Sequence, residues 1–296
     1  MKFLSVKEFS EKLHVSERTI RNYCSQGRIP GARLSFGVWM IPEEAQLPER
    51  KNKNCNRNYL LERLRMEKGS HISGGIFHMM QIQFTYNSNH MEGSTLSEEQ
   101  TRYIFDTNSV IVEDQEFIKT DDVIETINHF DCISRVIDFA NYQLSEAFIK
   151  ELHYILKRGT SSVRNHHCPL GEYKNLSNSV GGKETASPFE VPILMKKLLQ
   201  EYNQKETHSF EEIIDFHYKF ENIHPFFDGN GRVGRLIMLK ECLKNNFVPI
   251  LIKDEFKEFY YRGLKEYEKE KGYLIDACLH GQDIVSSYLD YFNIKH

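Results

Sequence analysis

Twelve consecutive residues, 224–235, bring together side chains that could take a proton, bind a metal ion and hold phosphate. They read His-Pro-Phe-Phe-Asp-Gly-Asn-Gly-Arg-Val-Gly-Arg. An apolar helical pattern runs up to His224, and Pro225 cannot continue that helix, so we expect His224 at the helix exit. A histidine has an ordinary pKa of about 6.5, which suits removal of a proton from a hydroxyl group near neutral pH. His224 is therefore a candidate general base.

The glycines of this segment predict a phosphate-binding turn. Gly229 and Gly231 flank Asn230, and a new apolar helical pattern begins with Val233. Glycines allow close approach and unusual backbone angles. The free N–H groups and the positive dipole end of the helix that follows favour a negatively charged group.

Charged side chains surround this turn. Arg232 and Arg235 are three residues apart, so both can reach the same polyphosphate from one helix. Asp228 supplies an oxygen ligand suited to Mg²⁺ that is shared with phosphate oxygens. A base, a metal ligand, a phosphate-binding turn and two arginines predict phosphoryl or nucleotidyl transfer. The sequence has no GxxxxGK[ST] pattern, which excludes a P-loop enzyme.

The whole segment resembles the motif HPFx[DE]GNGRxxR of the Fic (filamentation-induced-by-cAMP) family, with every defined position matched. The resemblance extends from about Tyr59 to the C-terminus. Most members transfer AMP from ATP to Ser, Thr or Tyr of a target protein, so it implies ATP and Mg²⁺ as cofactors and a protein substrate. It also implies a role for each motif residue: the base is His224, the metal ligand is Asp228, and the α-, β- and γ-phosphates are held by Gly229, Asn230, Gly231, Arg232 and Arg235.

The same resemblance assigns two further regions. The loop 176–183 falls where the family has a flap that aligns the target segment by strand addition. Its tip, Val180, Gly181 and Gly182, is expected beside the nucleotide. Lys174 replaces the arginine of the family's usual Gly-x-Tyr-Arg, which keeps the charge but loses the planar fork. Tyr260 and Tyr261 match a pair that lines the adenine pocket in some members; two core aromatic residues are an equal alternative. His153 and His217 match common histidine positions, for which we expect structural roles.

Upstream, Ser88-Asn-His-Met-Glu92-Gly93 resembles the family's inhibitory motif, [ST]xxxE[GN]. Ser88 and Glu92 are four residues apart, so both face the same side of a helix. Glu92 can form a charge-assisted pair with Arg235 and so withhold that arginine from the γ-phosphate. The position of the motif before the core implies an intramolecular inhibitory helix.

Most elements that position these residues are expected to be helices. Apolar residues recur at helical spacing from about Tyr59 onward, and capping patterns begin at Ser97, Ser145 and Ser209. Residues 173–185 lack this spacing and predict a loop or a short hairpin. We expect a mainly α fold with a small β-hairpin flap.

The N-terminus predicts a winged helix-turn-helix. Ser5 and Glu8 form a capping box, a second helix starts near Ser16, and residues 34–41 read as a strand–turn–strand. Residues 3–45 resemble excisionase and MerR-type DNA-binding modules. The resemblance places a second helix in the major groove and a wing on the backbone, with DNA contacts from Arg18, Thr19, Arg21, Asn22 and Arg33. Protein docking is the alternative.

Charge and composition agree with a basic head on an acidic body. The net charge is −4, but residues 1–57 hold 11 Lys and Arg against 6 Asp and Glu, a balance of +5, which leaves −9 for the rest. We expect a DNA-binding domain at 1–50, a linker and inhibitory region at 51–105 and a catalytic domain at 106–296. Six scattered cysteines, no signal peptide and no long apolar run indicate a cytoplasmic protein without a membrane span.

Three functions fit this pattern. The first is a self-inhibited protein adenylyltransferase that modifies a target protein and itself. The second is a transcriptional regulator in which the Fic site only senses nucleotide. The third is an enzyme that also removes AMP, with Glu92 positioning water. Kinase-type relatives replace the middle glycine, whereas Gly231 is present here, which favours AMP transfer. Dimerisation is common in the family, so a homodimer is a further expectation.

Overall fold

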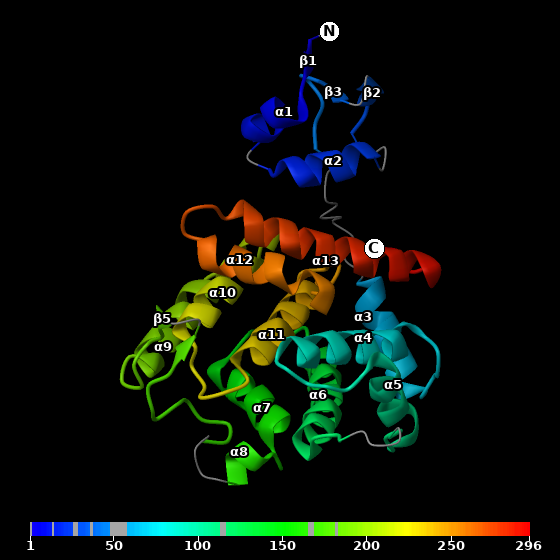
Figure 1. The fold of residues 1–296 in the computed structure, drawn as a ribbon. Helices are drawn as coiled ribbons and strands as arrows, with labels where there is room; N and C mark the ends of the chain where they lie inside the picture. The colour runs from blue at the N-terminus through cyan, green and yellow to red at the C-terminus, as the bar shows by residue number, and fades with distance from the viewer. Residues whose placement is uncertain are drawn as a thin grey trace. The chain divides into compact units, whose positions relative to one another are not determined.

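The computed structural model describes most of the chain, in two compact units (Figure 1). One unit is drawn from residues 1–56 and 258–280, and the other from residues 57–257 and 281–296. We call the second unit the helical body. The residues described are 2–13, 15–25, 29–35, 38–47, 58–112, 117–164, 169–180 and 183–296.

The N-terminal region folds as two short helices and an antiparallel sheet with strand order β1-β3-β2. Its elements are β1 (Phe3–Leu4), α1 (Val6–Leu13), α2 (Glu17–Ser25), β2 (Arg33–Ser35) and β3 (Val38–Pro42). Leu34 lies opposite Trp39 in the β2–β3 hairpin. The side chains of Phe9, Ile20 and Ile41 are fully buried between the helices and the sheet. The predicted pair of helices followed by a hairpin is confirmed.

The first unit also includes residues 258–280, which contain parts of two helices near the C-terminus. They are α12 (Lys257–Glu266) and α13 (Gly272–Tyr291), the latter continuing past residue 280. Gly263 of α12 approaches the backbone of Leu274 so closely that a Cβ atom there would lie 2.6 Å from the Leu274 Cα. A side chain at position 263 would push these two helices apart.

The helical body confirms the expected mainly α fold. Its hairpin consists of β4 (Ser179–Val180) and β5 (Lys183–Glu184), which pair antiparallel within the predicted flap. The remaining elements are helices: α3 (Tyr59–Gly69), α4 (Ile76–Met91), α5 (Glu98–Thr107), α6 (Thr120–Phe139), α7 (Glu146–Lys157), α8 (Ser161–Arg164), α9 (Val191–Tyr202), α10 (Phe210–Ile223), α11 (Asn230–Lys244) and the short η1 (Asp254–Phe256).

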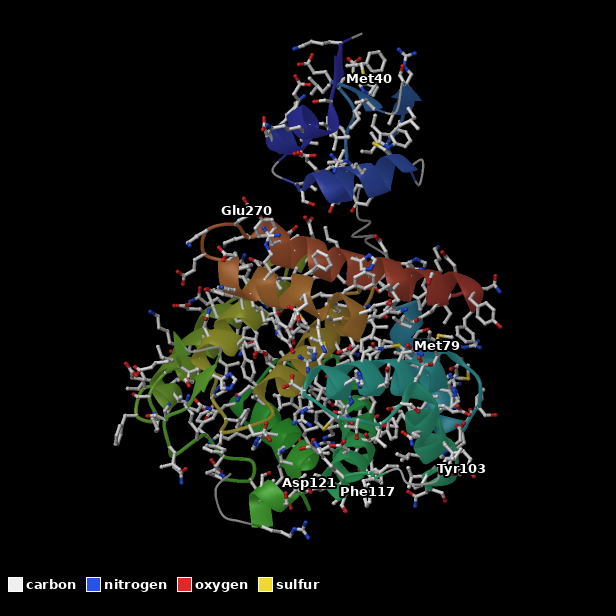
Figure 2. The ribbon with its side chains drawn as sticks, viewed as in Figure 1. Met40, Met79, Tyr103, Phe117, Asp121 and Glu270 are labelled. Atoms are coloured by element: carbon white, nitrogen blue, oxygen red, sulfur yellow. The ribbon has the colours of Figure 1, made fainter. Side chains whose placement is uncertain are left out.

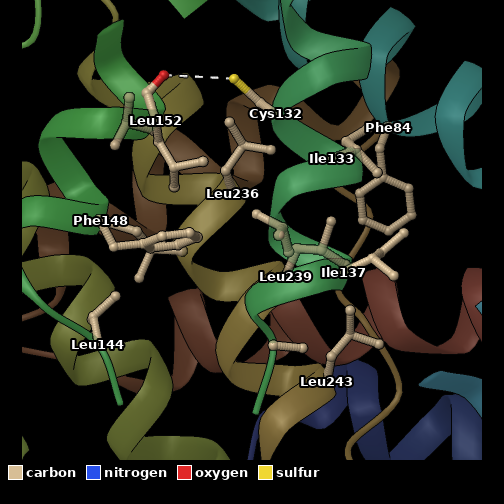
Figure 3. Packing of buried hydrophobic residues seen from close by; sticks show 14 of the residues in the cluster. Phe84, Cys132, Ile133, Ile137, Leu144, Phe148, Leu152, Leu236, Leu239 and Leu243 are labelled. Atoms are coloured by element: carbon tan, nitrogen blue, oxygen red, sulfur yellow. Dashed lines mark hydrogen bonds between the residues drawn. The ribbon is translucent and has the colours of Figure 1, made fainter. Parts of the chain in front are cut away.

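Helices α6, α7, α10 and α11 form the centre of the body, with α11 packed against the other three. Figure 3 shows apolar side chains from α6, α7 and α11 meeting there, among them Ile133, Leu152 and Leu236. The thiol of Cys132 is fully buried in this core and donates to the Leu152 carbonyl oxygen at 3.5 Å. This close packing holds α11 in place, and the segment 224–235 leads into its N-terminal end.

Capping side chains start the helices where the sequence predicts. The hydroxyls of Ser97, Ser145 and Ser209 each accept a hydrogen bond from a backbone N–H in the first turn of α5, α7 and α10. Ser97 and Ser209 make full capping boxes with Gln100 and Glu212. In the part of the chain that the structure describes, no helix has the length and apolarity to cross a membrane.

Candidate active site

The segment 224–229 forms a tight turn between α10 and α11. His224 ends α10 in a left-handed conformation, φ 51° and ψ 62°, and its N–H donates to the Phe220 carbonyl at 3.0 Å. Histidine is among the residues that tolerate this region. Phe226 is fully buried and stacks on the His153 ring at 4.0 Å between ring centroids. The stacked rings of Phe226 and His153 thus hold the turn in place. His224 is at the helix exit, as predicted.

Asn230 closes the turn with its side chain. Its amide oxygen accepts from the Phe226 N–H and its amide nitrogen donates to the Phe226 carbonyl, both at 2.8 Å. The side chain is therefore occupied in shaping the loop, and only the backbone of Asn230 is available to a phosphate.

The helix that follows starts earlier than the apolar pattern suggests. α11 begins at Asn230 rather than near Val233, because Gly229 adopts φ 84° and serves as its N-cap, accepting from the Val233 N–H at 3.0 Å. Of the two glycines, only Gly229 precedes the helix, and Gly231 lies within its first turn. The N–H groups of that turn have no partner inside the helix. Their role as anion-binding donors stays a prediction.

The segment 88–93, for which the sequence predicts an inhibitory role, contacts this first turn. Glu92 caps the C-terminal end of α4, and Gly93 follows with φ 92°. The Arg235 guanidinium donates to Glu92 Oε1 at 2.7 Å, to Ser88 Oγ at 2.9 Å and to the Ser88 carbonyl at 3.0 Å. A Cβ atom on Gly231 would collide with Glu92 Oε1. The carboxylate of Glu92 therefore lies where an anion bound at this turn would have to lie.

The charges explain why this arrangement holds. Burial by itself raises the pKa of Glu92, but the neighbouring Arg235 and Arg232 outweigh burial and lower it. Glu92 is therefore ionised at neutral pH and pairs with Arg235 as a carboxylate.

Glu221, which sequence reasoning missed, lies on α10 behind Gly234 with one carboxylate oxygen buried. Burial raises its pKa to about 8 against the effect of Arg235, so at neutral pH it carries a proton. The charge of Arg235 is met by Glu92 rather than by Glu221.

A second charged group lies beside Asp228. Asp228 Oδ1 accepts from the Gly229 N–H at 2.6 Å, and its Oδ2 pairs with Lys157. Lys157 also pairs with Glu125 of α6, and Glu125 in turn pairs with Arg232. Burial raises the pKa of Asp228, but Lys157 and Arg232 lower it to about 2 overall. Asp228 is therefore ionised, and the predicted phosphate ligand Arg232 is buried and already paired.

Glu125 and Lys157 could not be identified from the sequence. Each is a single charged residue within a helical pattern, and they lie 32 positions apart. The available signal was the spacing of His153 and Lys157, which puts both on one face of α7, the face that meets the turn.

His224 is suited to accept a proton. Its pKa is lowered to about 4, mainly by burial and in part by the ammonium group of Lys174. The imidazole is therefore neutral at physiological pH, as a general base must be. His153, in contrast, is structural: its ring accepts from the Gly171 N–H at 3.1 Å and contacts the Asp228 carbonyl at 3.2 Å.

Lys174 anchors the base of the flap beside the turn. Its ammonium donates to Asn178 Oδ1 at 2.7 Å and to Thr185 Oγ1 at 2.6 Å, and its N–H donates to the Pro225 carbonyl at 2.9 Å. The Asn178 amide donates to the carbonyls of Phe226 and Phe227 at 3.3 Å each. Although lysine lacks the arginine fork, here it joins both arms of the flap to the catalytic turn.

The structure does not test the roles predicted for several further residues. Gly181, Gly182 and the side chain of Val180 lie outside the described residues. Tyr260 is buried and Tyr261 is half-exposed on α12, with ring centroids 5.6 Å apart, and both belong to the other compact unit. Their adenine-pocket role stays a prediction.

The predicted DNA contacts differ in exposure. Arg21 is exposed on α2 and pairs with Glu17 at 2.5 Å. Arg33 is exposed on β2, with its guanidinium 4.6 Å from the Phe3 ring centroid. Thr19 is buried, so it is less accessible than Arg21 and Arg33. The side chains of Arg18 and Asn22 lie outside the described residues.

The residues at the turn fit a metal ion only when a nucleotide accompanies it. Among the described residues, no group of three or more His, Cys, Asp or Glu could hold a metal ion. Asp228 offers a carboxylate to the turn, and the carboxylate of Glu92 there is paired with Arg235. Mg²⁺ typically uses one or two carboxylates together with substrate phosphates and water. A Mg²⁺ ion that arrives with the phosphates fits this donor set, and a permanently bound ion does not.

Comparison with known proteins agrees with this geometry. Residues 143–242 match the Fic/DOC family, and residues 3–45 match a helix-turn-helix domain. Over 189 residues the chain is 28% identical to the protein adenylyltransferase Fic of Drosophila grimshawi, covering 62% of this chain and 37% of that relative. The corresponding relative from Drosophila persimilis is 29% identical, covering 62% and 35%. The chain thus spans little more than a third of the length of these relatives.

Solved structures share the fold. A Fic-domain-containing signalling protein from Bacteroides thetaiotaomicron superimposes with a TM-score of 0.59 at 26% identity, covering 79% of this chain and 91% of that one. Fic-1 from C. elegans superimposes with a TM-score of 0.60 at 23% identity, covering 79% and 70%. The chain therefore carries a Fic/DOC domain, preceded by an N-terminal helix-turn-helix domain.

Proposed function

We propose that this protein is a self-inhibited protein adenylyltransferase, which moves AMP from ATP to a Ser, Thr or Tyr hydroxyl of a target protein and of itself. The observation that carries the proposal is the Arg235–Glu92 ion pair at 2.7 Å, made directly on the first turn of α11. A carboxylate held at a phosphate-binding turn marks that turn as an anion site. The adenylyltransferase relatives support AMP as the transferred group.

The chemistry follows from the residues at the turn. His224, which is neutral, removes the proton of the target hydroxyl as its oxygen attacks the α-phosphorus of ATP. The new O–P bond forms, the bond from the α-phosphorus to the bridging oxygen breaks, and pyrophosphate leaves. N–H groups at Gly229 to Gly231 and the side chains of Arg232 and Arg235 hold the phosphates. Asp228 would hold a Mg²⁺ ion that accompanies the nucleotide, and the ion would neutralise charge on the phosphates.

Self-inhibition is the second part of the proposal. While Glu92 pairs with Arg235, that arginine is not available to the γ-phosphate, and a negative charge faces the incoming phosphates. ATP is then bound weakly or with its α-phosphate misplaced relative to His224. Release requires Glu92 to leave the turn, which frees Arg235 for nucleotide.

Incubation of the full chain with labelled ATP, with and without Glu92→Gly, tests the proposal. We expect the substituted chain to label itself and proteins of a lysate. Tight nucleotide binding without any labelling would favour the alternative, a transcriptional regulator that senses nucleotide. Loss of label from a pre-labelled target by the wild-type chain only would show that Glu92 positions water and that the enzyme also removes AMP.

We further propose that the helix-turn-helix domain holds the enzyme on DNA. The exposed Arg21 and Arg33, together with the +5 charge of residues 1–57, favour a polyanion. We also propose that the domains meet near residues 50 and 105 and that Tyr260 and Tyr261 line an adenine pocket. A homodimer is a further part of this proposal. Sedimentation of the full chain with and without duplex DNA tests the DNA complex and the dimer together.

A further inference from the structure

A network of four charges lies beside the predicted phosphate-binding turn, with Lys157 and Arg232 buried and the Asp228 side chain 45% exposed, and the chemistry described above uses only part of it. Glu125, Lys157, Asp228 and Arg232 form it through three ion pairs, with a longer contact of 3.7 Å between Arg232 and Asp228. The side chain of Lys157 is only 3% exposed. Two carboxylates and two cations balance, as buried charges require.

Lys157 is fixed in place from several directions. Its stem packs beneath Gly229, where a Cβ atom would lie 3.5 Å from Lys157 Cδ. Its carbonyl accepts from the Thr160 hydroxyl at 2.8 Å. Its partner Glu125 lies one turn after Asp121 (labelled in Figure 2), which accepts from the Ser161 N–H at 2.9 Å and so fastens the start of α6. The ammonium group therefore has little freedom to leave the network.

The network limits how the two carboxylate oxygens of Asp228 can bind a metal ion. Oδ1 accepts from the Gly229 N–H at 2.6 Å, and Oδ2 pairs with Lys157. Each carboxylate oxygen thus already has one donor, which leaves one lone pair on each. A divalent cation that binds either oxygen therefore lies close to the ammonium group of Lys157.

We propose that Lys157 is a positioning residue that holds Asp228 and competes with the nucleotide's divalent cation for its Oδ2 atom. The inference rests on the proposed nucleotide site and extends it. Because of Lys157, Mg²⁺ tightens nucleotide binding by only a small factor, which we call the coupling between metal and nucleotide. The metal then gains little from Asp228 until phosphate oxygens supply most of its ligands. When Asp228 binds the metal, Glu125 remains paired with both Lys157 and Arg232.

The expected effect is large because the competing charges are close. A unit charge about 4 Å from a dication opposes it strongly even at the effective dielectric of a protein surface. Replacing Lys157 by a neutral side chain should therefore strengthen the coupling at least about tenfold. The coupling is the factor by which Mg²⁺ tightens binding of ADP. ADP is the suitable probe because it lacks the γ-phosphate and so avoids the contact between Arg235 and Glu92.

The experiment is titration calorimetry of ADP into the full chain, with Mg²⁺ and with EDTA. We expect Lys157→Met and Lys157→Gln to raise the coupling at least tenfold, and Lys157→Arg to keep the wild-type value within about threefold. Lys150→Met is the matched control on the same helix: its ammonium pairs with Glu146 and Glu172, away from Asp228, and the coupling should not change.

Two results overturn the proposal. An unchanged or weaker coupling in Lys157→Gln shows that Lys157 does not compete with the metal, while the proposed function stands. Absence of ADP binding by the wild-type chain overturns the inference and the nucleotide site together. If Lys157→Met fails to fold, Mn²⁺ titration of the wild-type ADP complex followed by electron paramagnetic resonance still decides. Mn²⁺ that binds as tightly to Asp228→Asn as to wild type shows that Asp228 does not hold the metal.

Discussion

Replacing Glu92 by glycine should activate the enzyme, and the structure sets the size of the effect. Arg235 donates a hydrogen bond to Glu92 at 2.7 Å, and it also donates to the Ser88 hydroxyl and carbonyl. A hydrogen bond between charged groups contributes about 1.5–3 kcal/mol. Since about 1.4 kcal/mol is a factor of ten, the labelling rate should rise roughly 10- to 100-fold. The Glu92 side chain is 28% exposed, which favours the lower half of that range.

The same change should destabilise the nucleotide-free protein. Arg235 is only 9% exposed, and loss of Glu92 leaves its charge without its carboxylate. We therefore expect a lower melting temperature for Glu92→Gly without ATP and a larger increase on ATP addition than in wild type. Glu99→Gly, an exposed glutamate in the first turn of α5, is the matched control and should not activate.

The assay is time-resolved incorporation of label from ATP into the full chain. The gain must depend on Arg235, so Glu92→Gly combined with Arg235→Ala should be inactive. An active double variant would show that Glu92 acts on something other than Arg235. Equal labelling rates for Glu92→Gly and wild type would refute self-inhibition altogether.

The remaining predictions concern the base, the turn, pH and DNA. His224→Ala should lower transfer by about 10²–10⁴-fold with nucleotide affinity by calorimetry nearly unchanged; near wild-type transfer would remove His224 from its role. Asn230→Ala should lose about 1–3 kcal/mol of unfolding free energy in urea, because two buried groups of Phe226 lose their partners; an unchanged midpoint would contradict this. Unfolding free energy should fall as pH drops below about 6.5, by up to about 1.4 kcal/mol per unit for each histidine. The unfolded chain takes up protons there, whereas burial lowers the folded pKa values of His129, His153, His217 and His224 to between about 3 and about 4; a flat profile from pH 6.5 to 5 would argue against it. Duplex DNA should bind the full chain with a salt slope near 0.9 per phosphate contact, reduced by Arg21→Ala and Arg33→Ala; no binding at low salt would leave protein docking.

The fold was largely predictable because its signals are local. Capping serines, helical apolar spacing and the glycine-rich turn lie within a few residues of the structure they determine, as at Ser209 and at His224. The start of α11 was wrong by about three residues. The side chain of Asn230 reaches back to the Phe226 backbone, a contact that apolar spacing does not report.

The site could be predicted only where a motif is continuous in sequence. Glu92 and Arg235 were expected to pair from two separate motifs, and they contact in the structure. Lys157 and Glu125 escaped prediction because their role comes from the packing of α6 and α7 against the turn. These contacts join α6 and α7 to the turn before α11, and the spacing of His153 and Lys157 on α7 does not reveal which residues they meet there.

The position of the label in ATP tests the central claim most directly. The Glu92→Gly chain is incubated with ATP labelled at the α-phosphate and, separately, at the γ-phosphate, and protein-bound label is measured. Transfer of AMP to a hydroxyl predicts stable label from the α-position and none from the γ-position, with both absent in Glu92→Gly combined with His224→Ala. Label from the γ-position, or none from either position with nucleotide bound, would contradict the claim.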